Sequence, residues 1–160
     1  MTDEELMTLA QAHEKFAKSL NGKTWDLLGK KDRSKEEDEL MILSASASLF
    51  HWLQIGTAVH AQRGEWLLAH VYTVLKKGDP ALEHAARCWE LTTENRSEMK
   101  DFDLAYAEEG LARVFALQGD SEKAKQHHKM AEEEGGKIAD PEDKQIFEGD
   151  FKAEPWFGMV

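Results

Sequence analysis

The sequence predicts an all-α fold of about seven helices that pair into αα-hairpins. Three observations support this prediction. The 160 residues include only three prolines, and helix-favouring Ala, Glu, Leu and Lys are abundant. Apolar residues recur at spacings of three and four. Capping residues precede the periodic segments, and glycines follow several of them.

The N-terminal helix is expected to begin at a capping box formed by Thr2 and Glu5. Its apolar stripe continues to Leu20, and Asn21-Gly22 is expected to end it. A charged linker then leads to residue 33. Three apolar residues of this linker are expected to pin it to the core: Trp25, Leu27 and Leu28.

Two central helices follow. Ser34 and Glu37 form a second capping box, and the helix that they start extends to about residue 55. Gly56-Thr57 interrupts the pattern, and the next helix is expected over 58–77. Helix is favoured over strand here because turn residues are absent and β-branched residues are few.

The remaining helices are defined by recurring stop and start signals. A glycine ends one helix, and an aspartate or proline starts the next. These signals are Gly78-Asp79-Pro80, Asp101 or Asp103, Gly119-Asp120, Gly135-Gly136 and Asp140-Pro141. Pro155 is expected to stop the last helix, leaving an apolar tail docked on the body.

Two segments of the chain match one another. Residues 64–91 align with residues 106–133 at an offset of roughly 41–42 residues, and each forms an αα-hairpin. This pattern resembles the tetratricopeptide repeat, whose period is about 34 residues. The signature positions are Leu111, Ala112, Phe115, Gly119, Ala124, His128 and Ala131 in the second copy, and Trp66, His70, Gly78 and Trp89 in the first.

The resemblance implies a right-handed array of helix pairs. Three stretches also resemble a group of bacterial tetratricopeptide-like proteins, and they imply no activity: Arg63 to Trp66, Asp101 to Ala105, and Pro155 to Gly158. We expect one domain over 1–160, with an N-terminal helix and linker (1–33), central helices (34–77), repeat pairs (64–96 and 103–135) and a capping helix (140–153).

The composition of the chain limits the classes of partner and the cellular compartment that we expect. The net charge of −11 argues against nucleic acid and anionic membranes. The single cysteine, Cys88, rules out an internal disulfide and is consistent with a reducing compartment. The acidic N-terminus lacks a signal-peptide pattern, so we expect a cytoplasmic protein.

No catalytic, metal or cofactor motif stands out, so the first hypothesis is a non-enzymatic module without a cofactor. It would bind a protein or peptide partner, or a second copy of itself. In tetratricopeptide-like arrays, the first helix of each pair usually contacts the partner. The candidate groove residues are His51, Trp52, Arg63, Glu65, His70, Tyr72, Tyr106, Glu109 and Arg113.

A second hypothesis comes from the apolar stretch between Leu40 and Leu75. Its only carboxylate is Glu65, which is expected to pair with Arg63 or Arg87. If the helix faces coincide, four polar residues would converge on a small-molecule or metal site, which could be catalytic. They are His51, His60, Glu65 and His70. The competing interpretation is that the histidines on the helix stripes are half-buried, hydrogen-bonded core residues, namely His13, His70 and His128.

Overall fold

The computed structural model of the chain describes residues 6–159. Within these residues the chain forms seven α-helices and one 3₁₀ turn. They are α1 (Leu9–Leu28), α2 (Lys35–Ile55), α3 (Ala58–Val74), α4 (Gly78–Glu94), η1 (Arg96–Glu98), α5 (Asp101–Gln118), α6 (Ser121–Gly136) and α7 (Pro141–Lys152).

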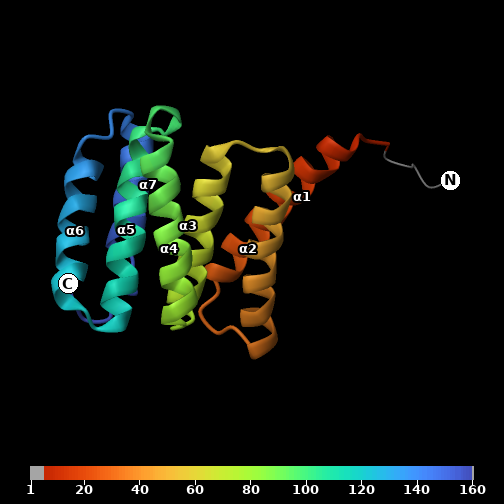
Figure 1. Ribbon diagram of the computed structural model, residues 1–160. Helices are drawn as coiled ribbons and strands as arrows, with labels where there is room; N and C mark the ends of the chain where they lie inside the picture. The colour runs from red at the N-terminus through yellow and green to blue at the C-terminus, as the bar shows by residue number, and fades with distance from the viewer. Residues whose placement is uncertain (1–5, 160) are drawn as a thin grey trace.

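The helices pack as consecutive pairs, α1 with α2, α3 with α4, and α5 with α6 (Figure 1). Adjacent pairs join through contacts of α2 with α3 and of α4 with α5. The first helix of one pair also contacts the first helix of another: α5 contacts α3. It contacts α7 as well. The predicted all-α array of helix pairs is therefore confirmed, and α7 covers the end formed by α5 and α6.

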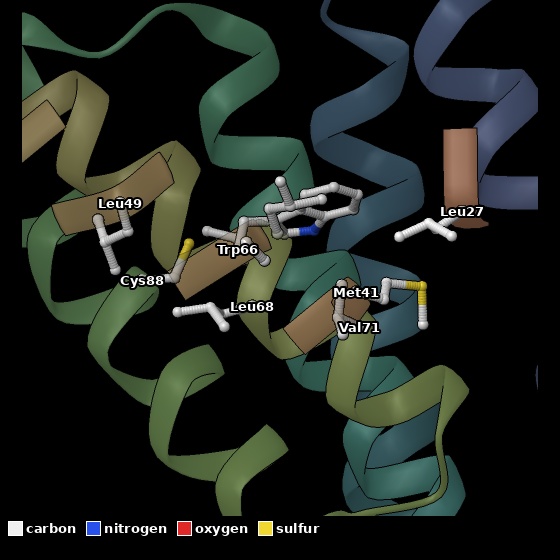
Figure 2. Packing of buried hydrophobic residues seen from close by; sticks show 10 residues of the cluster. Leu27, Met41, Leu49, Trp66, Leu68, Val71 and Cys88 are labelled. Carbon is white, nitrogen blue, oxygen red and sulfur yellow. The ribbon is translucent and has the colours of Figure 1, made fainter. Parts of the chain in front are cut away.

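The central core lies where α1, α2, α3 and α4 meet (Figure 2). Met41 and Val71 are fully buried there, and Leu27, Trp66 and Cys88 are nearly so. Each fully buried large apolar side chain contributes roughly 1.5–3 kcal/mol to folding. The apolar stretch noticed in the sequence therefore supplies much of the core.

Two glycines allow close helix contacts. A Cβ at Gly64 would lie 2.6 Å from Leu49 Cδ1, so α2 approaches α3 closely there. A Cβ at Gly135 would overlap the ring of Phe147, so α7 sits directly on α6. The glycine read as a helix end in the sequence therefore also serves as a packing site.

The N-terminal helix differs most from its prediction. The expected capping box of Thr2 and Glu5 lies outside the described residues, and α1 begins at Leu9 with a capping box of Thr8 and Gln11. The helix does not end at Asn21-Gly22 but continues to Leu28.

Burial explains this continuation. Three residues on one side of α1 are buried, namely Ala17, Thr24 and Leu27. Their packing outweighs the cost of about 1 kcal/mol that a glycine imposes on a helix interior. The residues assigned to a linker, Trp25 among them, therefore form the last turns of α1.

Most other start signals are confirmed. Ser34 with Glu37 caps α2, and Asp120 and Asp140 cap α6 and α7. At α5 the N-cap position belongs to Lys100 rather than to an aspartate. Asp103 lies three residues further on, where it accepts a 2.9 Å hydrogen bond from the Lys100 N–H.

The internal repeat has a period of 43 residues. Helix α3 begins at residue 58 and α5 at residue 101, which is 43 residues later. Helix α4 begins at residue 78 and α6 at residue 121, again 43 residues later. Both copies also contain the same side-chain group. Glu65 contacts His84 at 2.6 Å in the first copy, and Glu108 contacts His127 at 2.7 Å in the second. The sequence alignment at 41–42 residues was wrong because it matched Gly78 with Gly119.

The correct equivalent of Gly119 is Lys76. Both residues adopt the left-handed conformation, with φ of 78° for Gly119 and 60° for Lys76. We expect Lys76→Gly to raise the free energy of unfolding by on the order of 0.5–1 kcal/mol, because a left-handed non-glycine residue costs roughly 1–2 kcal/mol. Urea denaturation would measure this gain.

Gly119→Ala is the matched control and should destabilise the protein by a similar amount, because it adds the strain that Lys76→Gly removes. If Lys76→Gly were neutral or destabilising, the equivalence of these two positions in the repeat would lose its energetic support.

Candidate functional site

A row of neighbouring pockets lies between α1, α3, α5 and α7, and α2 also lines the first of them. Three adjoining pockets of about 330, 250 and 280 Å³ form it. The first and second share Asn21 and Arg63, and the second and third share Trp25, Trp66 and Asp150. We call this feature the inner groove.

The inner groove extends along α3 from His60 to Val74. Fourteen helical steps span about 21 Å. An extended peptide advances about 3.3 Å per residue, so the inner groove matches roughly six residues of extended chain.

Aromatic rings line its middle. The Trp25 ring stacks on that of Trp66, with centroids 6.0 Å apart, and His70 lies parallel to Trp66 at 5.0 Å. Tyr106 meets Trp66 edge to face at 5.1 Å. Trp66 is buried, whereas Trp25 remains 40% exposed and offers an aromatic surface to a ligand.

One polar pair borders the middle pocket. Arg63 donates two hydrogen bonds to Asp103, of 2.9 and 3.1 Å, and its guanidinium lies 4.9 Å from the centre of the Phe102 ring. Asp103 is buried, and this forked contact compensates its charge. Arg63 is therefore held at the junction of two pockets, with part of its side chain exposed.

A second polar pair connects α5 with α7. The Tyr106 hydroxyl donates a 2.6 Å hydrogen bond to Asp150. Burial raises the pKa of Tyr106, and the hydrogen bond to Asp150 adds to the rise, so the phenol stays protonated and acts as a donor. This contact fixes Asp150 at the place where two pockets meet.

A buried ionic cluster of Arg113 and Glu109, which we call the ionic cluster, packs behind the residues that line the inner groove. Arg113 and Glu109 are both buried and form an ion pair within α5. Glu109 also accepts a 2.7 Å hydrogen bond from the Trp66 indole N–H. Arg113 donates to three backbone carbonyls, those of Asp150, Ala153 and Pro155. Its guanidinium lies 4.1 Å from the centre of the Trp156 ring, which is buried, so the C-terminal tail is docked on the body.

The nine predicted groove residues fall into three sets. Four line the inner groove: Trp52, Arg63, His70 and Tyr106. Glu109 and Arg113 lie beneath it as the ionic cluster. Glu65, Tyr72 and His51 contact other parts of the array.

The expected pairing of Glu65 was wrong. Its carboxylate contacts His84 on α4, and Tyr72 stacks on the same imidazole at 5.6 Å. Arg63 instead pairs with Asp103, and Arg87 with Glu90. Residues on one helix can face different neighbours, and the sequence did not reveal which face of α3 holds Glu65.

The residues of the second hypothesis have separate partners. His51 contacts His13 on α1, His60 stacks on Trp52 at 4.3 Å, and His70 stacks on Trp66. Glu65 bonds to His84 on the outer helix. Across residues 6–159, no group of three or more His, Cys, Asp and Glu side chains could hold a metal ion.

Sequence reasoning missed several groove residues. The sequence predicts a linker at Trp25 and only a helix cap at Asp103, whereas both residues line the middle pocket. Asn21 and Trp25 are spaced by four residues, which would place them on one helix face. That spacing would have identified them had the helix not been ended at Asn21-Gly22.

The half-buried position of His70 predicts a pH dependence of stability. Burial lowers its pKa to about 3, and the positive charge of Arg113 acts in the same direction. Below about pH 6.5 the unfolded chain binds a proton at this histidine, whereas the folded chain does not. The free energy of unfolding should therefore fall as the pH falls from 6.5 toward 3, by at most about 1.4 kcal/mol per pH unit from this group.

Replacing His70 with Phe keeps an aromatic ring in the stack and removes the proton site. Urea denaturation between pH 7 and pH 4 should give a shallower decline for His70→Phe than for the original chain. Equal slopes for the two proteins would contradict this account of His70.

Comparison with protein-family models, with curated proteins and with solved structures finds no match to this chain. Each helix in the described part, residues 6–159, is too short or too polar to cross a lipid bilayer.

Proposed function

We propose that this chain is a non-enzymatic binding module whose inner groove holds an extended segment of a partner protein. The observation that carries the proposal is the alignment along α3 of three pockets that share lining residues. Three pockets join over about 21 Å along α3, which suits a peptide better than a compact small molecule. The paired helices support the resemblance to tetratricopeptide-like arrays, which we include in this proposal.

The polar groups of the groove support binding rather than catalysis. Arg63 engages Asp103, and Tyr106 engages Asp150, so these groups hold positions instead of exchanging protons. Burial raises the pKa of the Cys88 thiol, which makes it a poor nucleophile. The free, buried cysteine also agrees with a cytoplasmic setting, and the net charge of −11 disfavours nucleic acid as the partner.

The charges at the groove suggest the chemistry of the partner segment. Lys18 lies at the end near His60, whereas Asp150 and Glu154 lie toward the end near His70. The aromatic surface of Trp25 lies between these ends. We therefore expect a segment with a large apolar or aromatic side chain for Trp25 and a basic side chain for Asp150 and Glu154.

An array of immobilised seven-residue peptides of varied sequence would test this proposal. The chain should select peptides that combine an aromatic and a basic residue. Trp25→Ala should weaken the binding of selected peptides at least tenfold, because exposed tryptophans in grooves are common binding hot spots.

Trp89→Ala is the matched control. Trp89 is 41% exposed, nearly the same as Trp25, but it lies on α4 beside Glu108 and outside the inner groove. It should bind peptides as the original chain does. Failure to select any peptide, or equal losses for both tryptophan variants, would refute the proposal.

A further inference from the structure

Two histidines meet outside the inner groove. His13 on α1 and His51 on α2 have their Nδ1 atoms 2.8 Å apart, with ring centroids 5.1 Å apart. A hydrogen bond between them requires one bare nitrogen, because a proton can lie on only one side of it. The pair is therefore prearranged to share a proton or a metal ion.

The pair lies within an apolar surface, which we call the α1–α2 end face. Phe16 and Phe50 contact the His51 ring at 5.4 and 5.6 Å and are 51% and 57% exposed. Further exposed leucines extend the surface along both helices, at helical spacing from these rings. They are Leu9 (76% exposed), Leu43 (63%) and Leu53 (58%).

The position of this face in the array is unusual. Helix α3 packs against α2 and α5, α4 packs against α3 and α5, and α7 covers α5 and α6. The first pair, α1 and α2, packs extensively only against α3 among the described helices. Terminal faces of helical arrays are normally polar, so an apolar terminal face indicates an interface.

A second copy of the chain fits this face best. Imidazole nitrogens are ligands for Zn²⁺, Cu²⁺ and Ni²⁺, and zinc takes four ligands in tetrahedral geometry. One chain offers two of these ligands at the face. A two-fold axis through the ion would bring the same two histidines from a second copy, which completes the set with an isologous interface.

The geometry and the charge agree with this arrangement. Two ligands at 2.0–2.1 Å from a tetrahedral ion are about 3.3 Å apart, so the two rings would separate by about half an ångström. Each copy carries a net charge of −11, so two copies repel. Four neutral imidazoles leave the ion with its full positive charge, which reduces that repulsion at the contact.

We propose that a Zn²⁺ ion joins two copies of this chain at the α1–α2 end face, bound by His13 and His51 of each copy. The exposed phenylalanines and leucines pack around the ion and exclude water. This inference is independent of the inner groove, because His13 and His51 do not line it.

The test is the mass of the full chain in solution, measured by light scattering after gel filtration. The chain treated with a chelator should be a monomer, and half an equivalent of zinc chloride should double its mass. His13→Gln should remain a monomer with zinc. Cobalt(II) in place of zinc should give the intense visible absorption of a tetrahedral site in the original chain and not in His13→Gln.

Two further variants separate the role of the histidine ligands from that of the apolar residues around them. His84→Gln is the matched control, because His84 is also part-buried and hydrogen-bonded, and this variant should dimerise with zinc like the original chain. Phe50→Glu keeps both histidines and should weaken the zinc-dependent dimer at least tenfold. Circular dichroism would check that each variant is folded.

An unchanged mass after addition of zinc would overturn the proposal. A zinc-dependent dimer that His13→Gln leaves intact would also overturn it, because the ion would then bind elsewhere. A dimer that persists in chelator and in His13→Gln would show that the copies associate without the metal and would equally refute the site.

Discussion

Replacing Arg113 with methionine should lower the free energy of unfolding by about 3–5 kcal/mol, the usual cost of breaking a buried ion pair from one side. The change leaves Glu109 buried without its cation and removes the donor for three carbonyls near the C-terminus. Methionine fills a similar volume, so lost packing contributes little. Urea denaturation followed by circular dichroism would measure the loss.

Arg87→Met is the control for this prediction. Arg87 pairs with Glu90 on the surface, and an exposed pair of this kind contributes at most about 1 kcal/mol. In the double variant Glu109→Gln with Arg113→Met, the loss should be smaller than the sum of the two single losses, because the residues are coupled. Equal effects of Arg113→Met and Arg87→Met would contradict a structural role for the ionic cluster.

Replacing Phe147 with alanine should have a comparable effect, a loss of about 3–5 kcal/mol. Its ring is buried between α5, α6 and α7, where it meets Tyr106 edge to face at 5.0 Å and covers Gly135. Alanine would leave a cavity that the rigid helix ends cannot fill. For a chain of this length, the midpoint of thermal unfolding should fall by roughly 6–20 °C.

The adjacent residue gives a matched control. Ile146 is 54% exposed, so Ile146→Ala should cost well under half as much as Phe147→Ala. If the two variants unfolded at the same temperature, α7 would not be held to the array through Phe147.

The fold was largely predictable because local signals agree with the packing. Ser34 with Glu37, and Asp140 before Pro141, start helices through contacts within a few residues of each other. Such contacts do not depend on the rest of the chain. Gly22 was misleading because its local cost is small, and the burial that offsets it comes from α2, far away in the sequence.

The candidate site was predictable only in part, because several of its residues come together through contacts between helices that are distant in the sequence. Arg63 and Tyr106 were predicted because they lie on first helices. Trp25 and Asp150 join them only through the approach of α1 and α7, which no local pattern encodes. The partner of Glu65 could not be predicted either, because His84 lies on α4, 19 residues away, and meets Glu65 only through the packing of α3 against α4.

The 43-residue period has a consequence for how such a protein can change in size. Each unit contacts its neighbours through equivalent positions, so the stability of the array is approximately a sum over units and their junctions. An added copy of residues 58–100 would present Glu65 to the preceding Trp89, in the place that Glu108 occupies now. It would also place a second Trp66 where Glu109 accepts the indole N–H, which leaves that donor without its acceptor. Duplication followed by a single substitution that restores the acceptor would therefore lengthen the inner groove by one unit.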